Sequence, residues 1–145
     1  MRHILTEIEI AADAETVWQA LMDFEKYPEW NPFIQSIKGN TEPDEVLEVF
    51  IKPPGSRGMS FTPTVVSLEP NRLFAWQGKL LFRGLFDGRH EFRLEPNEQG
   101  TTKLTHSESF KGILVPVLWK MIRKGTERGF EEMNLALKNR IESGN

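Results

Sequence analysis

Two histidines and one glutamate, His90, His106 and Glu108, are the residues of this sequence whose types and spacing could do chemistry. The run Phe82–Glu95 alternates between apolar and charged residues, and successive side chains of a strand point to opposite faces. His90 falls in the apolar phase of that run, and His106 and Glu108 fall in the apolar phase of the next. Burying such groups is costly unless they are paired or hydrated, so we expect them to have a role on the inner face of a sheet.

The first of these runs divides into two sets. The inner set is Phe82, Gly84, Phe86, Gly88, His90, Phe92 and Leu94, and the outer set is Arg83, Leu85, Asp87, Arg89, Glu91, Arg93 and Glu95. The second run follows a turn at residues 96–100. In it, Leu104 and Phe110 share the inner phase with His106 and Glu108.

Three kinds of chemistry fit these residues. They could form a hydrogen-bonded polar cluster that closes one end of the barrel or merely hydrates it, which is the interpretation we rank first. They could transfer protons to a bound molecule, because histidine titrates near neutral pH; His90 or His106 would then be a base and Glu108 its orienting partner or an acid. Two imidazoles and a carboxylate could also bind a metal, but the spacing across strands is too loose to demand one, and no third histidine supports a metal except His3 at the start of the first strand. We therefore predict no metal and no cofactor.

The rest of the sequence predicts the elements that position these side chains. The run His3–Ile10 alternates as a half-buried strand, with Ile4, Thr6, Ile8 and Ile10 on one face. Asp13 is a good N-cap for a first helix, and a second short helix follows, bounded by prolines at 28 and 32. Further strands are predicted at Phe33–Lys38, Val46–Lys52, Met59–Leu68 and Arg72–Leu80. Pro116 opens a long final helix that reaches about Ser143.

Length and composition restrict the class of protein. With 145 residues, 39% hydrophobic and 27% charged, the chain is expected to form one domain over residues 1–145. A net charge of −3 argues against a nucleic-acid partner. Because there are no cysteines, disulfides, thiolate catalysis and cysteine zinc sites are excluded. The N-terminus lacks the apolar run of a signal peptide, and no stretch is apolar enough to span a bilayer, so we expect a cytoplasmic protein with no stable membrane insertion.

Five segments resemble the START/Bet v 1-like (SRPBCC) superfamily, in particular its polyketide cyclase/dehydrase and lipid transport type. They are Ala14–Trp18, Phe24–Pro32, Leu73–Trp76, Gly88–Phe92 and Gly100–Glu108. The resemblance covers essentially the whole chain. It implies an α+β helix-grip fold, in which a curved antiparallel sheet of about six to seven strands wraps around a long C-terminal helix and two short helices follow the first strand. It also implies a deep apolar pocket.

Twelve residues are predicted to line that pocket from the strands and the final helix. They are Phe74, Trp76, Phe86, His90, Phe92, His106, Glu108, Leu118, Met121, Ile122, Gly125 and Met133. The alternative is that these side chains fill a solid core. Gly125 and Gly129 either widen the pocket or let the helix approach the sheet. The run Lys52–Met59 is either a gating loop over the pocket mouth or an ordinary turn.

The final helix also carries four basic residues, Lys120, Arg123, Lys124 and Arg128. They could touch anionic lipid headgroups. Because glutamates 127, 131 and 132 interleave with them, we favour a solvated, salt-bridged helix face.

The function that these observations favour is the binding or transport of a small hydrophobic molecule, such as a lipid, a quinone, an aromatic compound or a polyketide-like compound. The protein is expected to be a monomer or a homodimer. A cofactor-independent cyclase or dehydratase is the first alternative, with His90, His106 and Glu108 as its acid–base groups. A protein-interaction or co-chaperone-like module is the second, and the charged outer face of the sheet argues against it.

Overall fold

The computed structural model of the chain describes residues 1–80 and 82–144. Its elements, in chain order, are β1 (Arg2–Ile10), α1 (Ala14–Met22), the 3-10 turn η1 (Phe24–Lys26), α2 (Tyr27–Trp30), β2 (Ile34–Lys38), β3 (Glu48–Ile51), β4 (Met59–Phe61), β5 (Thr64–Glu69), β6 (Leu73–Lys79), β7 (Asp87–Pro96), β8 (Thr102–Lys111) and α3 (Val115–Glu142). Asp13 caps α1 by accepting a hydrogen bond of 2.8 Å from the Thr16 backbone N–H. Pro116 lies in the first turn of α3. The α+β class and the order of elements predicted from the sequence are confirmed.

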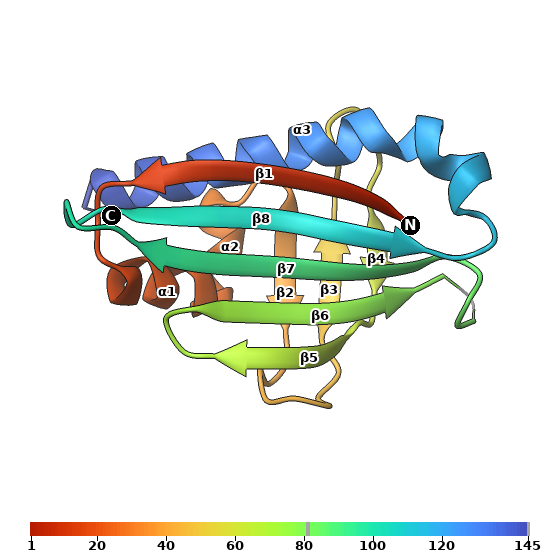
Figure 1. Cartoon of the computed structure of the whole chain (residues 1–145), viewed down its shortest axis with the longest axis horizontal. Helices are drawn as coiled ribbons and strands as arrows, with labels where there is room; N and C mark the ends of the chain where they lie inside the picture. The colour runs from red at the N-terminus through yellow and green to blue at the C-terminus, as the bar shows by residue number, and fades with distance from the viewer. Residues whose placement is uncertain (81, 145) are drawn as a thin grey trace.

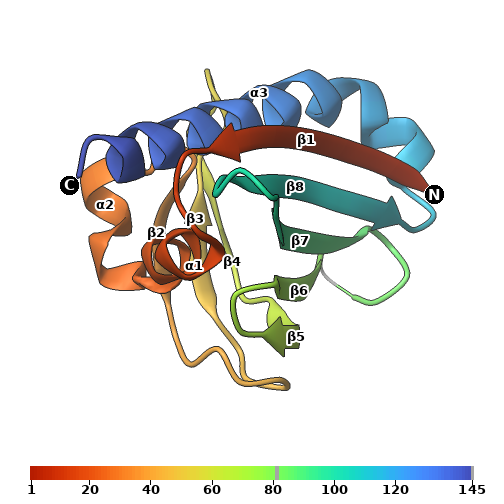
Figure 2. The ribbon, with the colours of Figure 1, turned by 60° about the vertical axis from the view of Figure 1, so that its left-hand side comes forward.

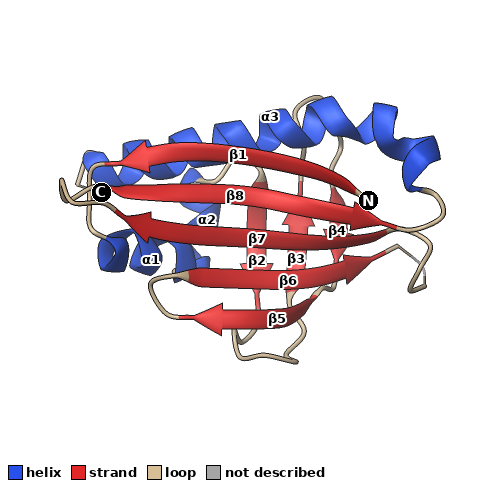
Figure 3. Cartoon of the chain, in the orientation of Figure 1, coloured by secondary structure: helices blue, strands red, loops and turns tan. Residues whose placement is uncertain are grey.

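The strands form two antiparallel sheets. The larger has the order β1-β8-β7-β6-β5 and the smaller the order β2-β3-β4. The strands of the smaller sheet lie behind the larger one and cross it steeply (Figure 1, Figure 3). The long helix α3 lies across the open side between the two sheets, along β1 (Figure 2). The core therefore forms between the larger sheet, the smaller sheet and α3.

The register of β7 and β8 brings the candidate residues together. His90 pairs with Glu108 across the two strands, and Phe92 pairs with His106. Alternate residues of β7 from Gly88 to Leu94 are buried. The inner-face positions predicted for His90 and His106 are confirmed, because both side chains are buried.

The strand prediction is wrong for residues 82–86, which form a turn rather than the start of β7. Phe82, predicted to point inward, is 58% exposed, whereas Leu85, predicted to point outward, is 9% exposed. Ladder pairing begins only at Asp87, whose carboxylate accepts a hydrogen bond from the Gly84 backbone N–H. Gly84 has φ +92°, a conformation that suits a turn and ends the alternation.

The run Met59–Leu68, predicted as one strand, is divided between the two sheets. β4 ends at Phe61 and β5 begins at Thr64. Pro63 stands between them, and its ring leaves no N–H for a ladder hydrogen bond. The chain therefore passes from the smaller sheet to the larger one at this proline.

Candidate functional site

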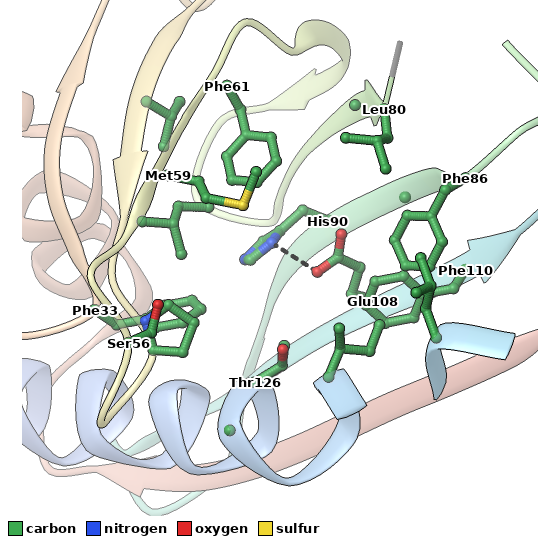
Figure 4. Close-up of a pocket in the computed structure, with 18 of the residues that line it drawn as sticks. Phe33, Ser56, Met59, Phe61, Leu80, Phe86, His90, Glu108, Phe110 and Thr126 are labelled. Carbon is green, nitrogen blue, oxygen red and sulfur yellow. Dashed lines mark ion pairs between the residues drawn. The ribbon is translucent and has the colours of Figure 1, made fainter. Parts of the chain in front are cut away.

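A cavity of about 560 Å³ lies between the two sheets and α3. Its walls are mostly apolar, with side chains from β3, β4, β6, β7, β8 and α3. Figure 4 shows Met59 and Phe61 on one side of it, Phe86 and Phe110 on the other, and the side chains of His90 and Glu108 turned toward each other between them. A largely apolar cavity with few polar groups is typical of a site for a small hydrophobic molecule.

The cavity is lined by eight of the twelve residues predicted from the sequence. These are Trp76, Phe86, His90, Glu108, Leu118, Met121, Ile122 and Gly125. The other four, Phe74, Phe92, His106 and Met133, are buried in the core and do not line the cavity.

The two helix glycines have different surroundings. A side chain at Gly129 would collide with the ring of Phe33, so this glycine allows α3 to approach the smaller sheet. Gly125 lines the cavity, and the nearest atom to a Cβ there is the Pro53 Cβ at 3.7 Å.

The smaller sheet supplies a wall that the sequence prediction missed. Phe33, Val49, Ile51 and Phe61 line the cavity from this side. Alternation in the run 46–52 places Val49 and Ile51 in one phase and was a usable signal. The run Lys52–Met59 connects β3 to β4 and also contributes lining residues, among them Pro53 and Met59.

A chain of polar contacts leads from the cavity into the core. Glu108 Oε1 lies 3.5 Å from His90 Nδ1, and His90 Nε2 lies 2.7 Å from His106 Nε2. His106 Nδ1 is 2.9 Å from Asn134 Oδ1, and Asn134 Nδ2 donates a hydrogen bond of 2.8 Å to Thr6 Oγ1. The Thr6 hydroxyl in turn donates to the His106 carbonyl oxygen at 2.9 Å. Elements β7, β8, α3 and β1 are thus joined by one network.

The contacts of Thr6 and Asn134 determine which atom donates and which accepts along this network. The single hydroxyl proton of Thr6 goes to a carbonyl, so Thr6 accepts from the amide of Asn134 and the amide oxygen faces His106. His106 must then donate from Nδ1, which leaves its Nε2 as an acceptor when the ring is neutral. His90 donates from Nε2 to that atom and keeps a lone pair on Nδ1. This lone pair is directed to Glu108 at the cavity.

Aromatic rings enclose both imidazoles. Phe130 stacks on His106 with ring centroids 3.9 Å apart, and Trp76 stacks on His90 at 4.6 Å. Burial lowers the pKa of His90 to about 3 and lowers the pKa of His106 well below its ordinary value, with a further contribution from the neighbouring His90. Both rings are therefore neutral at physiological pH. This agrees with the assignment of one ring proton to each, on Nδ1 of His106 and on Nε2 of His90.

Glu108 is the acidic group among the described lining residues of the cavity, whose other polar residues include Ser56, Lys79 and Thr126. Its side chain is 18% exposed, and burial raises its pKa to about 8. At neutral pH the carboxyl is protonated, and its Oε1 lies 3.5 Å from His90 Nδ1. Its carboxyl group lies over Gly88, where a Cβ would collide with it. Gly88 thereby makes room for an acid on the wall of the cavity.

Thr6 and Asn134 are parts of the network to which the sequence reasoning assigned no role. Asn134 lies on α3 between Phe130 and Leu137, both of which are buried. A polar residue at helical spacing between two core residues is a signal for a buried contact. Thr6 was placed on the inner face of the first strand, and its burial there is confirmed.

No cluster of three or more histidine, aspartate or glutamate residues suited to a metal occurs in residues 1–80 and 82–144. The Nε2 atoms of His90 and His106 are directed at each other. His3 lies at the exposed end of β1, with Nδ1 3.0 Å from the Ser109 hydroxyl.

A family model described as "Polyketide cyclase / dehydrase and lipid transport" matches residues 1–142. The chain belongs to this family. None of the curated proteins matches the sequence. Within the described residues, no helix is both long and apolar enough to cross a membrane.

Two solved structures from other organisms share the fold. A START superfamily protein from Mycobacterium smegmatis is 24% identical, with a TM-score of 0.77 over 99% of both chains. The Zhui aromatase/cyclase from Streptomyces sp. R1128 is 19% identical, with a TM-score of 0.77 over 97% of this chain and 93% of that one. The helix-grip fold expected from the resemblance is confirmed.

Proposed function

We propose that the protein binds a small hydrophobic molecule in the cavity between its two sheets and α3. The observation that carries the proposal is the cavity of about 560 Å³, whose walls are apolar except at a few polar groups that include the contact between Glu108 and His90. An apolar body would fill the space, because removing apolar surface from water is favourable. A neutral hydroxyl or carbonyl group on the ligand would meet the protonated Glu108.

The charge state of the site narrows the ligand class. A ligand carboxylate would find no cation among the polar pair, because His90 is neutral and Glu108 is either neutral or negative. Burying an unpaired charge is costly, so a neutral group is favoured beside this pair, whereas an acidic group of a ligand would have to lie near Lys79, which also lines the cavity. Phenols, quinones, sterol-like alcohols and polyketide-like compounds meet this requirement.

A variant with a filled cavity tests the proposal. Ile122→Trp places a larger side chain in the cavity wall, whereas Leu135→Trp adds the same ring at a position on α3 that is 52% exposed. The probe is N-phenyl-1-naphthylamine, a neutral apolar fluorophore, and thermal unfolding shows that each variant is folded. We expect Ile122→Trp to weaken probe binding by about tenfold and Leu135→Trp to leave it unchanged.

Native mass spectrometry of protein taken from cells supplies the second arm. A retained lipid, quinone or aromatic compound supports the proposal. If no such compound is retained and both tryptophan variants bind the probe as the parent does, a filled or unused cavity is the better description.

A cyclase or dehydratase is a second candidate. The positions of the protons in the network favour it. A lone pair on His90 Nδ1 faces an acid, so the pair could accept one proton from a bound molecule and return another. The test is turnover of a polyketide-like substrate by His90→Gln and Glu108→Gln. Turnover that survives both changes would exclude this chemistry.

A further inference from the structure

The charges of this acidic chain are distributed unevenly around the mouth of the cavity. Three segments, residues 52–62, 79–87 without residue 81, and 111–126, carry eight of the 18 lysines and arginines but only one of the 21 aspartates and glutamates. The eight basic residues are Lys52, Arg57, Lys79, Arg83, Lys111, Lys120, Arg123 and Lys124. We call these three segments the basic rim. The rest of the chain is strongly acidic, although the overall net charge is only −3.

The three segments are neighbours in space. Backbone N–H groups of Ile113 and Leu114 donate to the carbonyls of Gly84 and Leu85, at 3.1 and 3.0 Å, which joins two of the segments. Gly125 faces Pro53 and joins the third. Each segment also contributes lining residues to the cavity. The rim is thus one region beside the cavity.

The basic side chains of the rim are free to meet an external charge. All eight are exposed, and within the described part of the chain none of them forms an ion pair. The glutamates of α3 that were expected to neutralise Lys120 and Lys124 begin only at Glu127. The one acid of the rim, Asp87, accepts a hydrogen bond from the Gly84 backbone.

Apolar side chains stand among these charges. The exposed ones on the rim are Met59, Phe82, Ile113, Val117 and Met121, each between 53% and 74% exposed. Met59 and Met121 also line the cavity, so they mark its mouth. Exposed apolar side chains flanked by unpaired lysines and arginines are characteristic of surfaces that lie in the interface of an anionic bilayer.

We propose that the basic rim docks on an anionic phospholipid membrane, with Phe82, Ile113 and Val117 inserted among the acyl chains. Positive charge attracts the rim to the surface, and burial of the apolar side chains holds it there. In this orientation the mouth of the cavity faces the membrane. The docking does not depend on the proposed ligand, and Lys120, Lys124, Ile113 and Val117 do not line the cavity.

Co-sedimentation with vesicles tests the docking. Vesicles of phosphatidylcholine containing about one third phosphatidylglycerol are compared with vesicles of phosphatidylcholine alone. We expect binding to the anionic vesicles only, and weaker binding at high salt because exposed charges are screened. Lys120→Glu/Lys124→Glu is expected to lower the affinity at least tenfold. The matched control is Lys38→Glu/Arg72→Glu, which changes the net charge equally at exposed positions outside the rim.

A second pair of variants separates a membrane from an acidic protein. Ile113→Ser/Val117→Ser is expected to lower vesicle binding several-fold while leaving its salt dependence unchanged. The proposal is overturned if the parent does not bind anionic vesicles at low salt, or if Lys120→Glu/Lys124→Glu binds as the control does. It is also overturned if soluble polyglutamate binds as tightly as vesicles and Ile113→Ser/Val117→Ser binds vesicles as the parent does. That result would assign the rim to an acidic protein partner. Binding of N-phenyl-1-naphthylamine by the same variants reports separately on the cavity.

Discussion

Glu108 is an acid whose ionisation the fold opposes but does not prevent. Burial raises its pKa to about 8, so a modest rise in pH places a carboxylate in the wall of the cavity. A buried carboxylate without a cation draws in water, because the charged form is poorly solvated by apolar walls. The polarity of the cavity therefore depends on pH in the range just above neutral.

We predict that the affinity for N-phenyl-1-naphthylamine falls by roughly tenfold as the pH rises through about 8, and that Glu108→Gln removes this dependence. Glutamine cannot ionise but keeps a hydrogen-bonding group of the same size. Fluorescence titrations at several pH values measure the effect. Glu95→Gln, at an exposed position of β7, is the control and should behave as the parent. A parent protein whose affinity is flat with pH would show that the carboxyl does not ionise in contact with the ligand.

The second residue-scale prediction concerns the tautomers of the two buried histidines. We expect His106 to carry its proton on Nδ1 and His90 on Nε2, because Thr6 and Asn134 fix the direction of the network. Nitrogen-15 NMR of labelled histidine distinguishes the two forms. The reverse assignment would mean that the Asn134 amide is turned the other way.

Asn134→Leu tests how much the contact between His106 and Asn134 contributes to stability. It leaves the His106 Nδ1–H without an acceptor, and we expect the free energy of unfolding to fall by about 1–3 kcal/mol at pH 7. Urea denaturation measures the loss, with the exposed Asn139→Leu on the same helix as control.

The residue types were readable from the sequence, but their partners were not. Alternation along two strands placed His90 and His106 inside, since side-chain direction has period two. The contacts to Asn134 and Thr6 join positions 28 and 100 residues away from His106. Such contacts depend on how α3 and β1 pack on the sheet, and local periodicity carries no information about that packing.

At the scale of the elements, the two glycines of α3 allow a matched test of the helix grip. We predict that Gly125→Ala raises the free energy of unfolding by up to about 1 kcal/mol, because alanine favours the helix and its methyl group meets only Pro53 at 3.7 Å. Gly129→Ala is expected to lower it by about 1–3 kcal/mol, because the methyl group collides with the Phe33 ring. Urea unfolding of both variants measures the difference. Equal effects would contradict the close packing of α3 on Phe33.

Most element boundaries followed from turn residues, and the errors have definite causes. The alternation continues through residues 82–86 by composition, but Gly84 adopts a positive φ and the ladder starts only at Asp87. Pro63 marks the division of the run Met59–Leu68 into two strands. The hydrophobic pattern alone predicts one continuous strand there. In both places backbone restrictions overrode the pattern of side chains.

For the molecule as a whole, the buried histidines and Glu108 act on stability in opposite directions. The unfolded chain protonates both histidines below pH about 6.5, while the folded chain keeps them neutral, so their stabilisation is present above that pH and is lost as the pH falls. Glu108 has its pKa raised from 4.5 to about 8, so the folded chain holds a proton that the unfolded one has released. Its contribution therefore declines as the pH rises from about 4.5 to 8.

We predict that these three groups together give a maximum of stability near pH 6.5, because there two half-protonated histidines in the unfolded chain balance one protonated Glu108 in the folded chain. Glu108→Gln should shift the maximum to higher pH and raise the stability at pH 8.5 relative to that at pH 6.5. Urea denaturation at pH 5, 6.5 and 8.5 measures the profile, with Glu95→Gln as control. An unchanged profile in Glu108→Gln would show that the carboxyl titrates normally.

The pairing of β1 with β8 has a consequence for biosynthesis. His3 pairs with Ser109 and Ile10 pairs with Thr102, so among the described residues the first strand finds its ladder partner about a hundred residues later in the chain. The ribosome must therefore release β8 before β1 can join the sheet, and α3, which packs on β1, emerges after β8. Until then the alternating segment Arg2–Ile10 is an unpaired strand, open to pairing with other chains. Folding of this sheet is thus expected to be completed only after β8 and α3 have been synthesised, at a rate set by the closure of this long loop.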